Sequence, residues 1–123
     1  MTDKIKPQRK TGVAHFFAAA SYSFMGFQRL LQESAFRQET FAALAGLIAL
    51  PLLGVELPRV LGFLILMLML MAVEALNTAL EEIVDHLSPE WSQFAKNAKD
   101  LGSFAVACLI GANALYLLWA LFL

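Results

Sequence analysis

Residues 73–85 read Val73-Glu74-Ala75-Leu76-Asn77-Thr78-Ala79-Leu80-Glu81-Glu82-Ile83-Val84-Asp85. On a helix that advances about 100° per residue, four polar side chains of this run fall within roughly 80° of one another: Glu74, Asn77, Glu81 and Asp85. These four residues form one polar stripe along the expected helix, and we call it the acidic stripe.

The acidic stripe begins deep inside an apolar segment, because residues 60–73 contain no charged side chain. A helix that enters a bilayer through these residues places Glu74 below the headgroups. An ionised carboxylate at that depth costs about 2.5 kcal/mol or more unless it is neutralised, paired or bound to a metal. Glu74 is therefore a candidate functional residue.

The composition favours a membrane protein. Hydrophobic residues make up 59% of the 123 residues, and the mean hydropathy is +0.66, whereas soluble domains are about 45–50% apolar. The formal net charge of −1 argues against a nucleic-acid partner. The one cysteine, Cys108, lies in the last apolar run and is expected to be a buried packing residue.

The pattern of apolar residues predicts an all-α membrane protein with one domain over residues 1–123. Residues 1–12 are polar and indicate a flexible tail, and residues 13–32 have the amphipathic spacing of a helix lying on the membrane surface. Residues 40–57, 59–85 and 101–123 each contain a long apolar run, and a span needs about 20 residues. Three spanning helices are expected.

The segment between the second and third spans is expected to contain a break followed by a short helix. Ser88 is expected to cap this helix and Pro89 to open it, so that it reaches Lys99-Asp100. Basic residues are concentrated before the first span and between the second and third, with only Arg59 between the first and second. The N-terminus and residues 82–100 are therefore predicted to be cytoplasmic.

The polar residues have both structural and functional interpretations. Glu74 and Asn77 are suited to hydrogen-bonding partner helices, but a carboxylate is also suited to accept a proton. Glu81, on the acidic stripe, is either a solvated charge or a ligand for a divalent metal. Lys99 is either a topology signal or, with Asp100, a pair that holds phosphate and its counter-ion.

Glu33 and Glu39 lie outside the stripe, in a predicted connector, where solvated charge is the usual role.

The sequence has no glycine-rich phosphate loop and no zinc-spaced His/Cys cluster. If phosphate chemistry occurs, ATP is therefore expected to be held by carboxylate-bound Mg²⁺ and scattered basic groups.

Three stretches together resemble the signature of the prokaryotic diacylglycerol kinase family, which are small integral membrane lipid kinases. They are Glu74-Ala75-Leu76-Asn77-Thr78-Ala79-Leu80-Glu81, Asp85, and Ala98-Lys99-Asp100-Leu101-Gly102-Ser103. The surface helix, the connector Glu33-Ser34-Ala35-Phe36-Arg37-Gln38-Glu39 and the spacing of the spans also match, so the resemblance covers nearly the whole chain. The surface helix departs from the pattern, with His15 where the best-known members carry arginine.

This resemblance implies a homotrimeric helical bundle in the bacterial inner membrane, with active sites shared between subunits. It implies direct transfer of the ATP γ-phosphate to the hydroxyl of a membrane lipid, with Mg²⁺ and with Glu74 as general base. Glu33 and Glu81 resemble the Mg²⁺ ligands of the family, and the resemblance implies that both also bind the nucleotide. The other nucleotide contacts implied are Tyr22, Glu90, Trp91, Ser92, Lys99 and Asp100. The implied lipid-acceptor surface comprises Ala35, Phe36, Arg37, Gln38, Glu39, Glu74 and Ser103, and Asn77 and Asp85 support the site.

The resemblance favours diacylglycerol as the acceptor, because the connector and the Lys-Asp-Leu-Gly-Ser run look like those of the Gram-negative branch. Undecaprenol, the acceptor of other members, is the alternative within the family. A non-catalytic membrane assembly subunit, whose polar stripe only organises helices, is the alternative from another class. A proton-coupled transporter is disfavoured because the chain lacks an internal repeat.

Overall fold

The computed structural model of the chain describes residues 5–123. Within them, residues 5–11 have no regular structure, and four helices follow without any strand: α1 (Gly12–Leu30), α2 (Ser34–Leu52), α3 (Leu57–Leu87) and α4 (Gln93–Phe122). The predicted all-helical class is confirmed. Residues 1–4 of the predicted tail lie outside the described residues.

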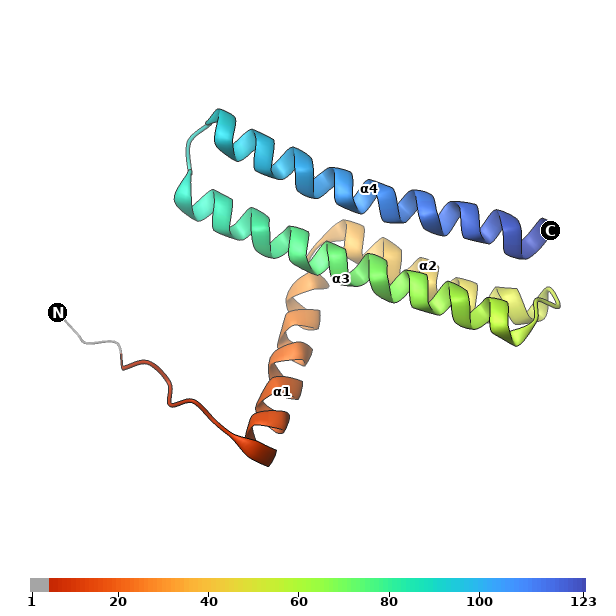
Figure 1. The fold of residues 1–123 in the computed structure, drawn as a ribbon, viewed down its shortest axis with the longest axis horizontal. Coiled ribbons are helices and arrows are strands. Elements are labelled where there is room, and N and C mark those ends of the chain that lie inside the picture. The colour runs from red at the N-terminus through yellow and green to blue at the C-terminus, as the bar shows by residue number, and fades with distance from the viewer. Residues whose placement is uncertain (1–4) are drawn as a thin grey trace.

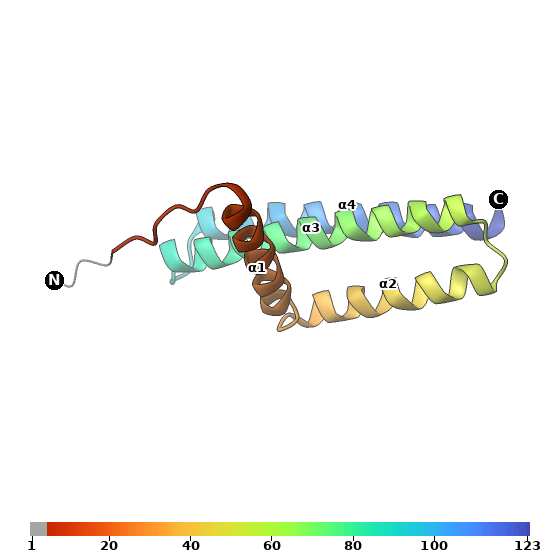
Figure 2. The ribbon, with the colours of Figure 1, turned by 90° about the horizontal axis from the view of Figure 1, so that it is seen from below.

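Helix α3 is the central element of the fold. Helices α2 and α4 both pack against it and run antiparallel to it, while α1 crosses it at a steep angle (Figure 1). The turn between α2 and α3 lies at the same end as the C-terminus, and the connection between α3 and α4 lies at the opposite end (Figure 2). The acidic stripe lies on the half of α3 that leads to this second end.

The core follows one seam of α3. Val60, Phe63, Met67 and Leu70 recur every three or four residues, so they share one face of the helix, and they are all buried. They pack on α2 through Ala43 and Leu50 and on α4 through side chains that include Leu109, Tyr116 and Leu117. Glu74 and Thr78 continue the same seam and are also buried. Glu74 therefore lies on the same face of α3 as the apolar core, one turn beyond Leu70.

Among residues 5–123, two helices are long and apolar enough to cross a membrane, namely α3 with 31 residues and α4 with 30. Helix α2 does not meet this standard. It begins at Ser34 and so includes Arg37 and Glu39, and it ends at Leu52, earlier than the predicted 40–57. Pro51 and Gly54, which has a φ of +81°, end the helix there. The third span stays a prediction.

Large apolar side chains remain exposed along the helices. Examples on α4 are Phe104, Ile110, Leu115 and Leu118. A row of such side chains on a long helix is typical of contact with lipid or with a partner helix. Cys108 is exposed among them, so the expectation that it is buried by packing within the chain was wrong.

Two local expectations also need correction. Residues 33–39 are not a connector, because α2 begins at Ser34 directly after Glu33. Ser88 and Pro89 do not open a separate helix: Ser92 caps α4 by accepting a 3.1 Å hydrogen bond from the Ala95 N–H. From Gln93 onward α4 is continuous, so the predicted short helix and the predicted 101–123 span are one element.

Candidate active site around the acidic stripe

Glu74 lies at the centre of a group of carboxylates. Its side chain is buried, with 7% of its surface exposed, and Oε2 has no hydrogen-bond partner. The charges of Glu81 and Glu33 both act on Glu74, and Glu74 in turn acts on Glu39. The carboxylate charges of α3, of α2 and of the turn before α2 are thereby coupled through Glu74.

Asn77 lies one turn beyond Glu74 on α3. Its Nδ2 group donates to Glu81 Oε1 at 3.4 Å, and its Oδ1 atom is buried without a partner. The contact to Glu81 places Asn77 beside a carboxylate of the stripe. Asn77 is therefore positioned to orient Glu81.

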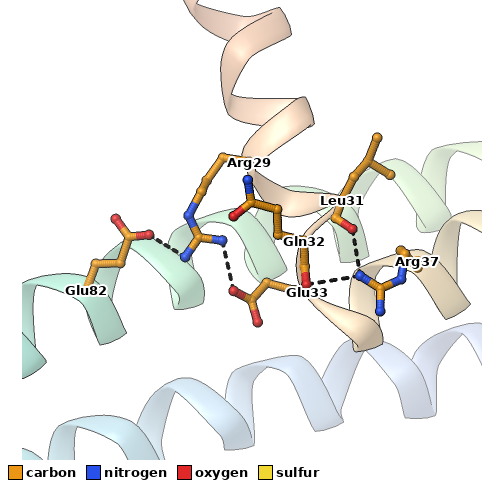
Figure 3. Close-up of polar contacts among 6 residues, drawn as sticks. All are labelled: Arg29, Leu31, Gln32, Glu33, Arg37 and Glu82. Atoms are coloured by element: carbon orange, nitrogen blue, oxygen red, sulfur yellow. Dashed lines mark hydrogen bonds and ion pairs between the residues drawn. The ribbon is translucent and has the colours of Figure 1, made fainter.

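Arg29, in the last turn of α1, joins this group from the side (Figure 3). Its Nη1 group lies 2.9 Å from Glu33 Oε1, and its Nη2 group lies 2.6 Å from Glu82 Oε1 on α3. The hydrogen bond that Arg29 donates to Glu33, with a further one to Glu82, raises the pKa of Arg29 above its ordinary value. Sequence reasoning did not include Arg29 or Glu82 among the site residues, because the contact depends on how α1 crosses α3.

Two residues of the expected lipid-acceptor surface instead hold the joint between α1 and α2. Arg37 Nη1 donates to the backbone oxygens of Leu31 at 2.8 Å and Gln32 at 3.0 Å (Figure 3). Phe36 is only 1% exposed and packs edge-on against Phe27 of α1, with ring centroids 5.8 Å apart. Both side chains stabilise the turn within this chain.

A cavity of about 380 Å³ lies where α3 gives way to α4. Lys99 Nζ lies 2.5 Å from Asp85 Oδ1 across it, and Lys96 pairs with Asp100. Five of the residues expected to contact nucleotide line this cavity: Glu90, Trp91, Ser92, Lys99 and Asp100. Lys96 and Ser88 also line it and were missed; the i, i+4 spacing of Lys96 and Asp100 was the signal available for Lys96.

A second, apolar cavity of about 480 Å³ lies between α2, α3 and α4. Its polar end contains Gln38 and Glu39, next to Ala35, so three of the expected acceptor residues line it. Ser103 and Tyr22 are exposed and line neither this cavity nor the one beside Lys99. Within a single chain they therefore contribute to neither of these two cavities.

The acids around Glu74 suit a magnesium ion that is shared with a nucleotide. Among residues 5–123, no three acidic, histidine or cysteine side chains converge closely enough to enclose a metal by themselves. Mg²⁺ in phosphoryl-transfer sites is usually held by one or two carboxylates together with substrate phosphates. Glu33 and Glu81 are carboxylates of the kind that such a site uses, and Glu33 is paired with Arg29 Nη1 at 2.9 Å.

Comparisons with known proteins give the family of the chain. The family model described as prokaryotic diacylglycerol kinase matches residues 21–122. The chain belongs to the prokaryotic diacylglycerol kinase family. A diacylglycerol kinase from Sinorhizobium sp. is 53% identical over 109 residues, which cover 89% of this chain and 80% of the relative. One from Escherichia coli K12 is 37% identical over 115 residues, covering 92% of each.

Membership of the prokaryotic diacylglycerol kinase family makes the chain an enzyme, a lipid kinase, and confirms the resemblance seen in the sequence. The two long apolar helices agree with a membrane protein. Within this kinase, the carboxylates around Glu74 and the cavity beside Lys99 lie along the same half of α3. One element thereby carries both a buried acid and the wall of a polar cavity.

Proposed function

We propose that the chain is an ATP-dependent diacylglycerol kinase that transfers the γ-phosphate of MgATP directly to the hydroxyl of diacylglycerol, giving phosphatidic acid and ADP. The observation that carries the proposal is the buried Glu74 carboxylate. It lies on the half of α3 that leads to the cavity of Lys99, and the charges of Glu33 and Glu81 act on it. Family membership supports the kinase class but leaves the acceptor to experiment.

Glu74 acts as the general base in this proposal. Its Oε2 atom is buried without a hydrogen-bond partner within the chain, so no other side chain occupies its proton-accepting lone pairs. The proton of the lipid hydroxyl moves to Glu74, the lipid oxygen forms a bond to the γ-phosphorus, and the bond from that phosphorus to the β,γ-bridging oxygen breaks. ADP leaves with the electron pair of that bond.

Glu33 and Glu81 would hold Mg²⁺, which when bound neutralises charge on the nucleotide phosphates. Arg29 lies against Glu33 and Glu82, so it holds the α1 side of the site in place while leaving a net negative charge there. Asn77 supports Glu81 by its hydrogen bond.

Lys99 and Asp100 contact the nucleotide in the proposal, with Glu90, Trp91 and Ser92 near its base or ribose. Their common cavity supports this assignment. Asp85 supports the site through its ion pair with Lys99. Tyr22 lies on the exposed face of α1, so we assign its phosphate contact to a neighbouring subunit's nucleotide.

We further propose a homotrimer with shared active sites in the bacterial inner membrane. Helix α2 is then the third span, and the N-terminus and residues 82–100 face the cytoplasm. Buried carboxylate oxygens without partners on Glu39 and Glu74 support a site that is completed by other groups. The apolar cavity beside Ala35, Gln38 and Glu39 is suited to the acceptor lipid, and Ser103 faces the acceptor from outside it.

The test is transfer of radiolabel from γ-labelled ATP to diacylglycerol and to undecaprenol, side by side, in mixed micelles with Mg²⁺. We expect label on diacylglycerol. Glu74→Gln should abolish transfer while cross-linking still yields a trimer, and Glu56→Gln, in the exposed turn before α3, should retain it. Label only on undecaprenol would replace the acceptor, and full activity of Glu74→Gln would remove the proposed base.

A further inference from the structure

Gly102 of α4 lies directly against the side chain of Asn77 on α3. A Cβ atom at residue 102 would overlap Asn77 Oδ1, whereas it would meet Leu80 Cδ2 at an ordinary 3.9 Å. Glycine inside a helix is about 1 kcal/mol less favourable than alanine. The glycine at residue 102 therefore leaves the space that the Asn77 side chain occupies.

The two ends of the Asn77 amide face different neighbours. Oδ1 is buried against Gly102 without a hydrogen-bond partner, and Nδ2 donates to Glu81 Oε1 at 3.4 Å. Because an amide group is planar and rigid, moving one end moves the other. The surface of α4 at Gly102 thus determines where the donor to Glu81 lies.

We propose that Gly102 is a positioning residue for the phosphoryl-transfer site, acting through Asn77 on Glu81. The inference rests on the proposed function in one respect, the assignment of Glu81 to the metal of the nucleotide. A side chain at residue 102 displaces the Asn77 amide, and Glu81 then loses the hydrogen bond that orients it. Loss of such an outer partner of a metal ligand usually weakens metal binding about 10- to 100-fold.

The experiment measures Mn²⁺ binding by electron paramagnetic resonance on the full-length protein in micelles, with a non-hydrolysable ATP analogue present. We expect Gly102→Ala to weaken Mn²⁺ binding about 10- to 100-fold, and Asn77→Ala to weaken it similarly. In the double variant Asn77→Ala/Gly102→Ala the methyl group meets no amide. We therefore expect it to bind Mn²⁺ as Asn77→Ala does.

Two glycines provide matched controls. Gly111, on the same helix, has open space around the position of a Cβ atom, so Gly111→Ala should leave Mn²⁺ binding unchanged. Gly62 has the same kind of close contact, with Tyr116, at the far end of α3. Gly62→Ala should lower the unfolding temperature without changing Mn²⁺ binding, which separates a packing defect from an effect on the site.

Unchanged Mn²⁺ binding by folded Gly102→Ala would overturn the inference, as would a double variant in which the two losses add. If Gly102→Ala does not fold, the double variant still decides, because we expect it to fold and to match Asn77→Ala. No nucleotide-dependent Mn²⁺ binding by the wild-type protein would refute the metal role of Glu81 itself. If the wild-type protein binds Mn²⁺ and the losses of the two single variants add in the double variant, only the role of Gly102 is refuted.

Discussion

Arg29 at the end of α1 and Glu82 on α3 form an ion pair of 2.6 Å, and the same guanidinium lies 2.9 Å from Glu33 at the start of α2 (Figure 3). One side chain thereby ties α1 to α3 and to the turn before α2. Helix α1 is thus connected to the carboxylates of Glu33 and Glu82 by charge as well as by the turn at residues 31–33.

Removing the charge of Glu82 should loosen α1. In Glu82→Gln, Arg29 retains Glu33 but loses its link to α3, so we expect faster amide hydrogen exchange in residues 24–30. The matched control is Gln28→Ala, an exposed position on the same helix. Equal exchange in Glu82→Gln and the wild type would show that packing alone holds α1.

Lys99→Met should weaken the nucleotide interaction. Lys99 lines the polar cavity and pairs with Asp85, so its loss removes one positive charge from the proposed phosphate side and leaves Asp85 without its partner. We expect the KM for MgATP to rise roughly tenfold with little change in the KM for lipid. The control is Lys10→Met in the exposed N-terminal segment; a change in the lipid KM alone would contradict the assignment.

Metal removal should stop the reaction reversibly. Chelation of Mg²⁺ should abolish transfer, and Mn²⁺ should restore it, because both ions accept carboxylate and phosphate oxygens. In Glu81→Gln the concentration of Mg²⁺ that gives half-maximal activity should rise about tenfold or more. Equal Mg²⁺ titrations for Glu81→Gln and Glu56→Gln would count against Glu81 as a ligand.

Phe36→Ala should act on stability. Phe36 is buried against Phe27, so removing its ring leaves a cavity in the joint, at a cost of about 3–5 kcal/mol in the free energy of unfolding. Thermal unfolding in micelles measures this, and Phe36→Leu should lose less. A raised lipid KM with unchanged unfolding temperature would favour the lipid contact expected from the family resemblance.

Arg59→Ala should loosen the far end of the bundle while leaving the site intact. Arg59 Nη1 donates to the Ala120 carbonyl oxygen at 3.1 Å, and its guanidinium lies 4.4 Å from the centre of the Trp119 ring. We expect a loss of about 1 kcal/mol in the free energy of unfolding and faster exchange in residues 118–122. A change in the KM for MgATP would show that this end is coupled to the site.

The acidic stripe was predictable because it depends only on the helical period. Glu74 and Glu81 lie within one helix, and their seven-residue spacing, about two turns, places them on one face whatever surrounds the helix. The cavity residues from Glu90 to Asp100 were predictable for a similar reason, since they are neighbours in sequence. Their assignment to a nucleotide came from the family resemblance.

Contacts between distant helices were not predictable from the sequence. The pairing of Arg29 with Glu82 depends on the angle at which α1 crosses α3, and the approach of Gly102 to Asn77 depends on the register of α4 on α3. The boundary of α4 was missed because Ser88 and Ser92 are both capable N-caps. Their Oγ atoms lie 2.7 Å apart, and Ser92 is the cap because its Oγ accepts the hydrogen bond from the Ala95 N–H.

The tight turn at residues 53–56 has a consequence for biogenesis. It joins α2, which is less apolar than a typical membrane-crossing helix, to the strongly apolar α3 with no room for a long intervening loop. In the proposed three-span topology the two segments would leave the translocon as a helical hairpin, and α3 would supply the partitioning energy for both. With a longer turn, α2 would emerge from the ribosome well before α3 and would have to insert by itself.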